Sequence, residues 1–260
     1  MLMRSLVVPA LGLVALSMAG PVAALEASGQ VIAVVRDTAA SGPAGDRALA
    51  VKGPVYSGDL IKTNRRGTAQ ILFADNTRMV IGPNSQVAVD DFVFSGSSKA
   101  STFAIDALRG SFRFITGASA KNVYSINTPT ATIGVRGTAF DGHVAKDGTT
   151  TIAMWHGAVR LCDKAESRRH CVDISGTCSM IQIAPHADFN RINNVYKRTE
   201  ILDRLVPFAF RQVRLMSEFR VSSGGCAIRD INPPWNPNRG EESAPPPAPT
   251  PAPAPEPEPD

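Results

Sequence analysis

Four cysteines are the residues of this 260-residue chain whose number and spacing most directly suggest chemistry, and they are Cys162, Cys171, Cys178 and Cys226. An even number of cysteines is typical of a disulfide framework when a chain leaves the reducing cytoplasm. The segments on either side of residues 163–170 look like the arms of a hairpin. This favours a Cys162–Cys171 pair and leaves Cys178 to pair with Cys226.

A zinc site is the alternative for part of this set. Cys162, His170, Cys171 and Cys178 are all possible zinc ligands. The adjacent His170 and Cys171 fit poorly around one tetrahedral ion, and the sequence contains no CxxC pair. We therefore expect two disulfides, and neither a metal nor a cofactor.

Catalytic patterns are scarce in the rest of the chain. The four histidines form no HExxH motif, and the sequence contains neither GxSxG nor a phosphate-binding loop. The acidic pair Asp90 and Asp91 would lie on a strand, where neighbouring side chains point to opposite faces and cannot share a site. The sequence therefore predicts a protein that is not an enzyme.

The densest motif runs from residue 125 to residue 140 and reads SINTPTATIGVRGTAF. Earlier segments read SGDLIKT at 57–63, FADNT at 73–77 and GPNS at 82–85. As an ordered set, these segments over residues 55–144 resemble the FecR family, whose domain follows the course GD-x-I-x-T, D-G-T, P-N-S and TP-x-A-x-x-x-V-R-G-T-x-F. Asn76 stands where the family usually has glycine, and both residues tolerate turn geometry. The matching motif residues are Gly58, Asp59, Asp75, Thr128, Pro129, Val135, Arg136, Gly137, Thr138 and Phe140.

We expect the motif residues to serve the fold, and the alternative is that Arg136 is exposed and binds a partner. Gly137 would permit a turn or a bulge, and Arg136 would bind backbone carbonyls or an internal carboxylate. In the namesake family this domain is the periplasmic half of an inner-membrane sigma-factor regulator, so the resemblance implies an interaction or sensing module. Only four residues precede the hydrophobic N-terminal stretch, and we therefore do not expect the cytoplasmic regulatory segment of those regulators.

Short strands between residues 29 and 183 are expected to position these motifs. They are rich in β-branched and aromatic residues and are bounded by turn residues. Gly29, Gly110 and Gly157 each begin such a strand, where glycine commonly marks a tight corner. The pattern predicts a mostly β fold, either solenoid-like or sandwich-like. The expected strands are 69–73, 77–81, 86–89, 92–94, 102–108, 112–115 and 123–126.

The N-terminus has the pattern of a signal peptide over residues 1–24. Arg4 precedes an apolar run over residues 6–19, and small residues follow at 22–24. The alternative is an uncleaved anchor, because the uncharged stretch is about as long as the roughly 20 residues of a spanning helix. Cleavage would leave a periplasmic or secreted protein without a transmembrane helix.

The pattern of apolar residues in the C-terminal part differs from that in the strands before it. We expect residues 25–183 to form the all-β region and residues 184–231 a helical segment, tethered by a disulfide. One or two amphipathic helices would lie within residues 189–219, interrupted at Pro207. Residues 232–260 are rich in proline and alanine and are expected to form a disordered tail.

The net charge of the chain indicates which class of partner the protein could bind. The net charge is +4, and the part without Arg4 and the acidic segment 239–260 holds 25 basic and 18 acidic residues. Outside the cytoplasm, such a surface suits a protein, a glycan or an acidic lipid better than nucleic acid. We expect a periplasmic protein–protein interaction or envelope-sensing module that binds an envelope protein. A binding protein for an acidic glycan, lipid or cell-wall component is the alternative.

Overall fold

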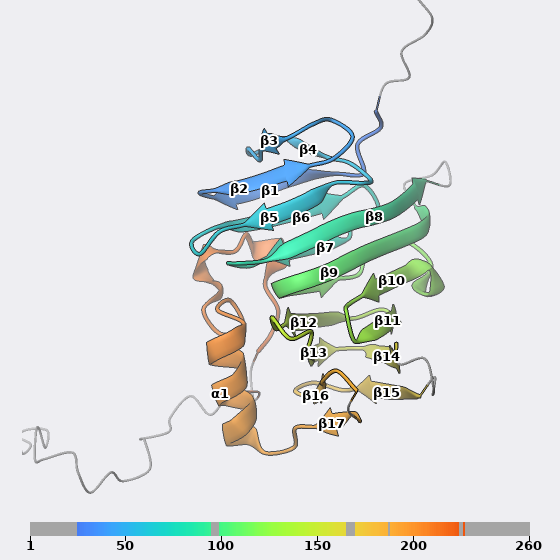
Figure 1. Ribbon diagram of the computed structural model, residues 1–260, viewed down its shortest axis with the longest axis vertical. Coiled ribbons are helices and arrows are strands. Elements are labelled where there is room, and N and C mark those ends of the chain that lie inside the picture. The colour runs from blue at the N-terminus through green and yellow to red at the C-terminus, as the bar shows by residue number, and fades with distance from the viewer. Residues whose placement is uncertain (1–24, 95–98, 165–169, 187, 224–225, 227–260) are drawn as a thin grey trace, which may run out of the picture.

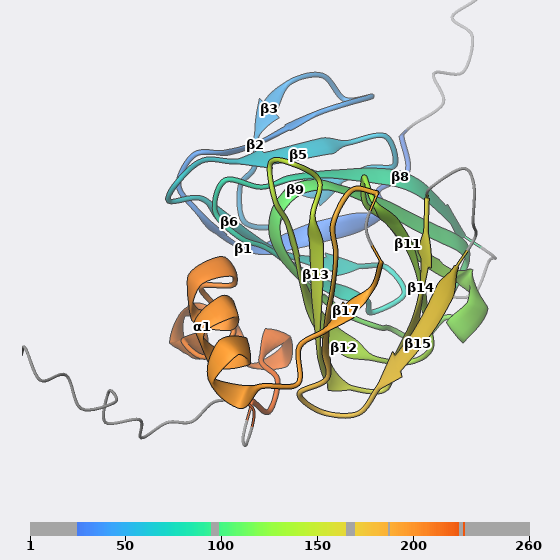
Figure 2. The ribbon, with the colours of Figure 1, turned by 60° about the horizontal axis from the view of Figure 1, so that its bottom comes forward.

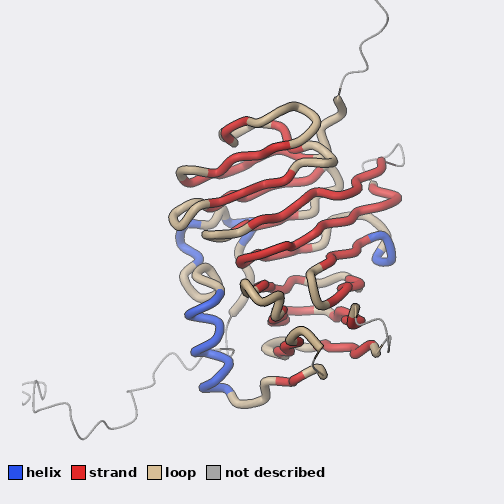
Figure 3. Tube along the Cα trace, in the orientation of Figure 1, coloured by secondary structure: helices blue, strands red, loops and turns tan. Residues whose placement is uncertain are grey.

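The computed structural model describes residues 25–94, 99–164, 170–186, 188–223 and 226 (Figure 1). The expected signal peptide and Pro-rich tail lie outside these ranges. Figure 3 shows that strands make up the body and that the helical turns lie on one side, apart from one short turn before β10. The elements are β1 (Gly29–Val35), β2 (Thr38–Ser41), β3 (Arg47–Ala48), β4 (Pro54–Val55), β5 (Leu60–Thr63), β6 (Thr68–Phe73), β7 (Arg78–Ile81), β8 (Gln86–Phe94), β9 (Ala100–Ile115), η1 (Lys121–Val123), β10 (Tyr124–Asn127), β11 (Ala131–Val135), β12 (Ala139–Val144), β13 (Thr150–His156), β14 (Ala158–Asp163), β15 (Cys171–Ser175), β16 (Met180–Ile183), β17 (Asn190–Arg191), α1 (Val195–Leu205), η2 (Gln212–Arg214) and η3 (Ser217–Phe219).

The strands form two facing sheets that share the long strand β9 (Figure 2). We call them sheet A, in the order β4-β1-β6-β7-β9-β12-β13-β16-β17, and sheet B, in the order β3-β2-β5-β8-β9-β10-β11-β14-β15. Neighbours are antiparallel except for β9 and β10, which run parallel. The architecture is a bent, open sandwich of the mostly β class that the sequence predicted.

Glycines mark the corners where the chain passes from one sheet to the other. Strand β9 crosses at Gly110, which has a φ of +90°, because Arg109 pairs within sheet B and Gly110 pairs within sheet A. Gly157, with a φ of +80°, forms the corner between β13 and β14. Two expected breaks do not exist: 102–108 and 112–115 are one strand, and so are 86–89 and 92–94. In β9, Gly110 bends the chain without ending the strand, since its missing Cβ allows a positive φ inside a ladder. Strand β8 contains no glycine and continues past Asp90 and Asp91 with a register shift between Val89 and Asp91.

The main core lies between the two sheets and is lined by alternate residues of each strand. Its centre is aromatic: the rings of Phe73, Phe103, Phe114 and Tyr124 meet with centroids 4.8 to 5.8 Å apart. Burial of such a side chain contributes about 1.5 to 3 kcal/mol. The strands that carry the motif residues are therefore fixed from the inside of the sandwich.

A second apolar cluster covers the outer face of sheet A. Trp155, Ile115 and Met180 of this face pack against Leu202 of α1 and Phe219 of η3. In Figure 2, α1 lies beside β12 and β13, on the side away from β14 and β15. Among the described residues, the outer face of sheet B has no such cover.

The C-terminal segment holds one α-helix and two short 3₁₀ turns. Helix α1 begins after Asn194, whose side chain accepts a hydrogen bond of 3.0 Å from the Lys197 N–H. It ends at Leu205, because a residue before a proline, here Val206 before Pro207, is disfavoured in the helical region. No helix in the described part of the chain is long and apolar enough to cross a membrane.

Both expected disulfides are present. Cys162 and Cys171 are directly paired residues of β14 and β15, and the bond closes their hairpin. Cys178, just before β16, is joined to Cys226. The zinc alternative does not fit, because the sulfur atoms of its three cysteines are bonded in disulfides and cannot act as thiolate ligands.

The two disulfides allow a matched test of how strongly the C-terminal segment is tethered. Replacement of Cys178 and Cys226 by alanine should lower the free energy of unfolding by about 4 kcal/mol, because their bond closes a loop of 48 residues. The matching replacement of Cys162 and Cys171, which are nine residues apart, should cost about 2.7 kcal/mol. Urea denaturation measures both variants, and equal losses would contradict a tether that acts through chain entropy.

Candidate functional site

The motif residues at the start of β5 form a structural corner. Gly58 has a φ of +83°, and Asp59 is buried beside it. Both carboxylate oxygens of Asp59 accept hydrogen bonds from the Arg47 guanidinium, one of them at 2.9 Å, and the Tyr56 N–H donates a third at 2.8 Å. The hydrogen bond to Asp59 raises the pKa of Arg47. Asp59 thereby joins the corner before β5 to β3.

Asp75 is the centre of a second buried network. Its Oδ2 accepts hydrogen bonds from the hydroxyls of Ser119 at 2.7 Å and Tyr124 at 2.8 Å, and its Oδ1 accepts one from the Thr77 N–H at 2.9 Å. Burial raises the pKa of Tyr124. Asn76, with a φ of +66°, adopts the left-handed turn for which the family uses glycine. The network fixes the β6–β7 hairpin to the chain that leads into β10.

The TP pair closes the turn between β10 and β11. The Thr128 hydroxyl accepts a hydrogen bond from the Ala131 N–H at 2.9 Å and another from the Thr150 hydroxyl at 2.8 Å. Pro129 lies next to Gly148, where a Cβ would come within 3.2 Å of the proline Cβ. This turn therefore packs against the loop before β13, and its polar groups form hydrogen bonds within the fold.

Three further motif residues are buried at the next corner. Val135 and Phe140 lie in the core, where the Phe140 ring meets Phe114 with centroids 5.8 Å apart. The Thr138 hydroxyl donates to the carbonyl of His156, and its N–H donates to the Thr116 hydroxyl at 3.0 Å. These contacts join β9, β12 and β13.

Arg136 is the exception among the motif residues. We expected a guanidinium bound to carbonyls or to an internal carboxylate, but the side chain is exposed and forms no hydrogen bond or ion pair with any described residue. Strand alternation explains this, because Val135 points into the core and Arg136 consequently points out. Its backbone N–H is bound to the Ala158 carbonyl at 3.0 Å, and Gly137 turns the chain with a φ of +65°.

On the outer face of sheet B, β10 and β11, which lead up to Arg136, carry small and polar residues. Asn127 donates to Asp106 at 3.0 Å, and the Thr132 hydroxyl donates to Asn127 at 3.1 Å. A Cβ on Gly134 would have only the Arg160 carbonyl nearby, at 3.8 Å. Strands β9, β10 and β11 therefore present side chains whose polar groups bind one another. This face is suited to binding a partner rather than to catalysis.

A buried ion pair that the sequence analysis missed joins sheet A to the C-terminal segment. The Arg113 Nε and Nη2 donate to the Asp141 carboxylate at 2.6 and 2.8 Å, and both side chains are fully buried. Arg113 Nη1 donates to Gln212 Oε1 at 2.6 Å and to the Phe219 carbonyl at 3.2 Å. The guanidinium also lies 5.6 Å from the centre of the Trp155 ring. The sequence signal that could have predicted this ion pair was the charged Arg113 within the otherwise apolar segment 112–115.

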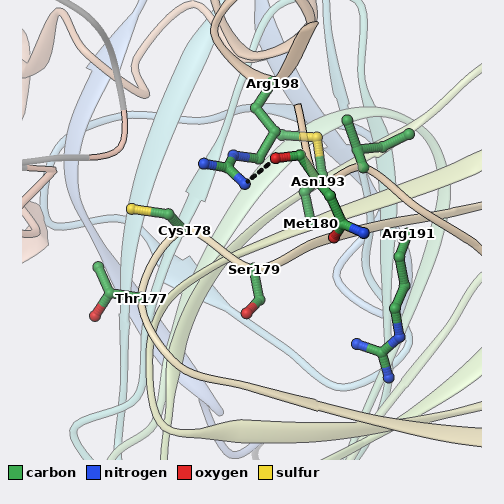
Figure 4. A pocket seen from close by; sticks show the side chains of 8 residues that line it. Thr177, Cys178, Ser179, Met180, Arg191, Asn193 and Arg198 are labelled. Carbon is green, nitrogen blue, oxygen red and sulfur yellow. Dashed lines mark hydrogen bonds between the residues drawn. The ribbon is translucent and has the colours of Figure 1, made fainter. Parts of the chain in front are cut away.

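A small pocket lies beside the Cys178–Cys226 bond (Figure 4). Its volume is about 150 Å³, below the roughly 300 Å³ at which ligand pockets begin. Two arginines line it, and both have protein partners: Arg198 donates to the Asn193 carbonyl at 3.1 Å, and Arg191 donates to the Asp173 carbonyl at 2.9 Å. Among the described residues, no group of three or more His, Cys, Asp or Glu residues could hold a metal ion.

Comparison with known proteins finds one family model that matches part of the chain. Residues 59–160 match the family model described as FecR protein. Two crystal structures of a protein from Parabacteroides distasonis, described as a "putative anti-sigma factor", are similar at 14% and 15% identity with TM-scores of 0.42 and 0.40. The similarity covers 55% and 54% of this chain and 63% and 64% of those chains, so this chain spans less than two thirds of their length. No curated protein matches the chain.

Proposed function

We propose, from the FecR domain that residues 59–160 of this chain form, that the protein is an exported, non-catalytic interaction module that takes part in envelope sensing. The observation that carries the proposal is the difference between the two outer faces of the sandwich. The C-terminal segment covers sheet A, and the outer face of sheet B, with Arg136 at its edge, has no cover among the described residues.

The chemistry of this face favours a protein partner with an exposed carboxylate. A guanidinium binds a carboxylate through two parallel hydrogen bonds, and arginine is enriched among residues that dominate binding energy. The polar groups of Asp106, Asn127 and Thr132 already bind one another. A partner would therefore gain specificity from Arg136 and contact area from the strands next to it.

Export is the second element of the proposal. Two disulfides suit an oxidising compartment, and the signal pattern over residues 1–24 would deliver the chain to the periplasm. We assign residues 25–183 to the β region, to which the short strand β17 (Asn190–Arg191) adds an edge, and the rest of residues 184–231 to the tethered segment. Residues 232–260 would extend from that segment as a tail.

Site-specific crosslinking tests the docking face. A photo-reactive amino acid at Ser125 of sheet B should crosslink in cells to one envelope protein, because the neighbouring Gly134 leaves room for it. Arg136→Ala should weaken this complex by about tenfold or more, as for a residue that dominates binding, with the melting temperature unchanged. Tyr196 on the exposed side of α1 is the matched control position.

Two results would contradict this assignment. Equal crosslinking from Tyr196 and Ser125 would show that the face of sheet B is not specific. A lower melting temperature for Arg136→Ala, with the crosslink retained, would return Arg136 to the structural role that the sequence suggested.

A further inference from the structure

A groove of about 600 Å³ lies between the corner at Gly110 and the C-terminal end of α1. We call it the α1 groove. Its polar lining comes from four separate segments, which are the β7–β8 turn, β9, the end of β12 with the loop after it, and α1. The polar residues are Asn84, Arg109, Ser111, His143, Lys146 and Arg204. Its volume falls within the roughly 300 to 1,000 Å³ of small-molecule sites.

Three unpaired cations converge on the α1 groove. Arg109, Lys146 and Arg204 form no hydrogen bond or ion pair with the part of the chain that the structure describes, and no described acidic residue lines the groove. The acids next to two of them in sequence are engaged elsewhere. Asp147 accepts hydrogen bonds from the Thr149 N–H at 2.9 Å and hydroxyl at 3.0 Å, and Asp203 is paired with Arg211 at 2.7 Å. A groove lined by charges of one sign concentrates ligands of the opposite sign.

Neutral polar groups stand beside these cations. The Asn84 side chain forms no hydrogen bond within the described residues and has both donors and an acceptor to offer. Burial, together with the charge of Arg204, lowers the pKa of His143 and so favours the neutral imidazole. Val144, Leu205 and Pro207 supply apolar wall between the polar groups. A neutral amide and an imidazole beside apolar surface suit the hydroxyls and carbon framework of a sugar.

We propose that the α1 groove binds a phosphorylated sugar, either as a free molecule or as the headgroup of a lipid. A phosphate monoester carries about two negative charges at pH 7 and presents three acceptor oxygens, which the two guanidiniums and one ammonium can bind together. Asn84 would meet the sugar hydroxyls. The site goes beyond the proposed protein partner, because Arg136 and the strands around it are not among the residues that line the groove.

Calorimetric titration of the disulfide-bonded mature chain with glucose 6-phosphate tests the site. Binding with a Kd of about 1 mM or below is expected, and the double variant Arg109→Ala/Arg204→Ala should weaken it by about tenfold or more, since charge-assisted hydrogen bonds are lost. The matched control, Lys62→Ala/Arg136→Ala, removes the same charge from the region of sheet B and should leave the Kd unchanged. It also separates the two proposals, because only this control should weaken the protein complex.

Further titrations define the ligand. Glucose should not bind measurably, and inorganic phosphate should bind more weakly than glucose 6-phosphate. Vesicles that contain phosphatidylinositol phosphate test the lipid source, and binding to these vesicles that the groove variant loses would also support the site. The proposal is overturned if neither ligand binds, if the groove and control variants lose the same affinity, or if inorganic phosphate binds as tightly as the sugar phosphate.

Discussion

Arg113→Met is expected to lower the free energy of unfolding by about 3 to 5 kcal/mol, as when one partner of a buried ion pair is removed. Methionine keeps most of the length of the arginine stem but leaves the fully buried Asp141 carboxylate without its partner. Gln212 and the Phe219 carbonyl also lose the donor that joins them to sheet A. Urea denaturation followed by circular dichroism measures the loss.

The double variant Arg113→Met/Asp141→Leu is the matched control. It replaces the pair by apolar residues of similar size, and such replacements are often neutral or stabilising. We therefore expect it to recover most of the stability that Arg113→Met loses. An equal loss in both variants would mean that Arg113 acts through its hydrogen bonds to the C-terminal segment and not through its charge.

This ion pair marks the limit of what the sequence could predict. Arg113 and Asp141 are 28 residues apart, and Gln212 is 99 residues from Arg113. Local patterns predicted that segment 112–115 is a strand, but not which face of it would be covered. Arg113 is buried because α1 and the turns after it cover the outer face of sheet A. Its burial could be predicted only by knowing where these C-terminal elements pack.

Arg136 shows the opposite situation, because a local rule would have been sufficient. Val135 is buried, so the alternation of a strand places Arg136 on the outer face. The expectation of a guanidinium bound within the fold came from the interpretation of the whole motif as structural, since buried arginines commonly serve folding. The disulfides, in contrast, were predictable, since the spacing of Cys162 and Cys171 matched a hairpin and left one further pair.

The corner at Gly110 carries the second large expected effect. A Cβ at this position would lie 2.5 Å from the Ser85 Cα and 2.2 Å from its hydroxyl oxygen, and the φ of +90° is strained for any other residue. Ser85 cannot move away easily, because its hydroxyl accepts a hydrogen bond from the Ser111 N–H at 3.0 Å. Gly110→Ala should therefore lower the free energy of unfolding by about 3 to 5 kcal/mol, as backbone strain and overpacking add.

Gly176→Ala separates these two contributions. Gly176 has a φ of +85°, close to that of Gly110, but the nearest atom to its Cβ position is the Ser179 hydroxyl oxygen at 3.9 Å. Its replacement should cost about 1 to 2 kcal/mol, which is the cost of the backbone conformation alone. The difference between the two variants, measured by denaturation under the same conditions, gives the cost of crowding Ser85. Equal losses would show that the two sheets can separate at this corner to admit a methyl group, and that close packing of Ser85 on Gly110 does not hold β9 in both sheets.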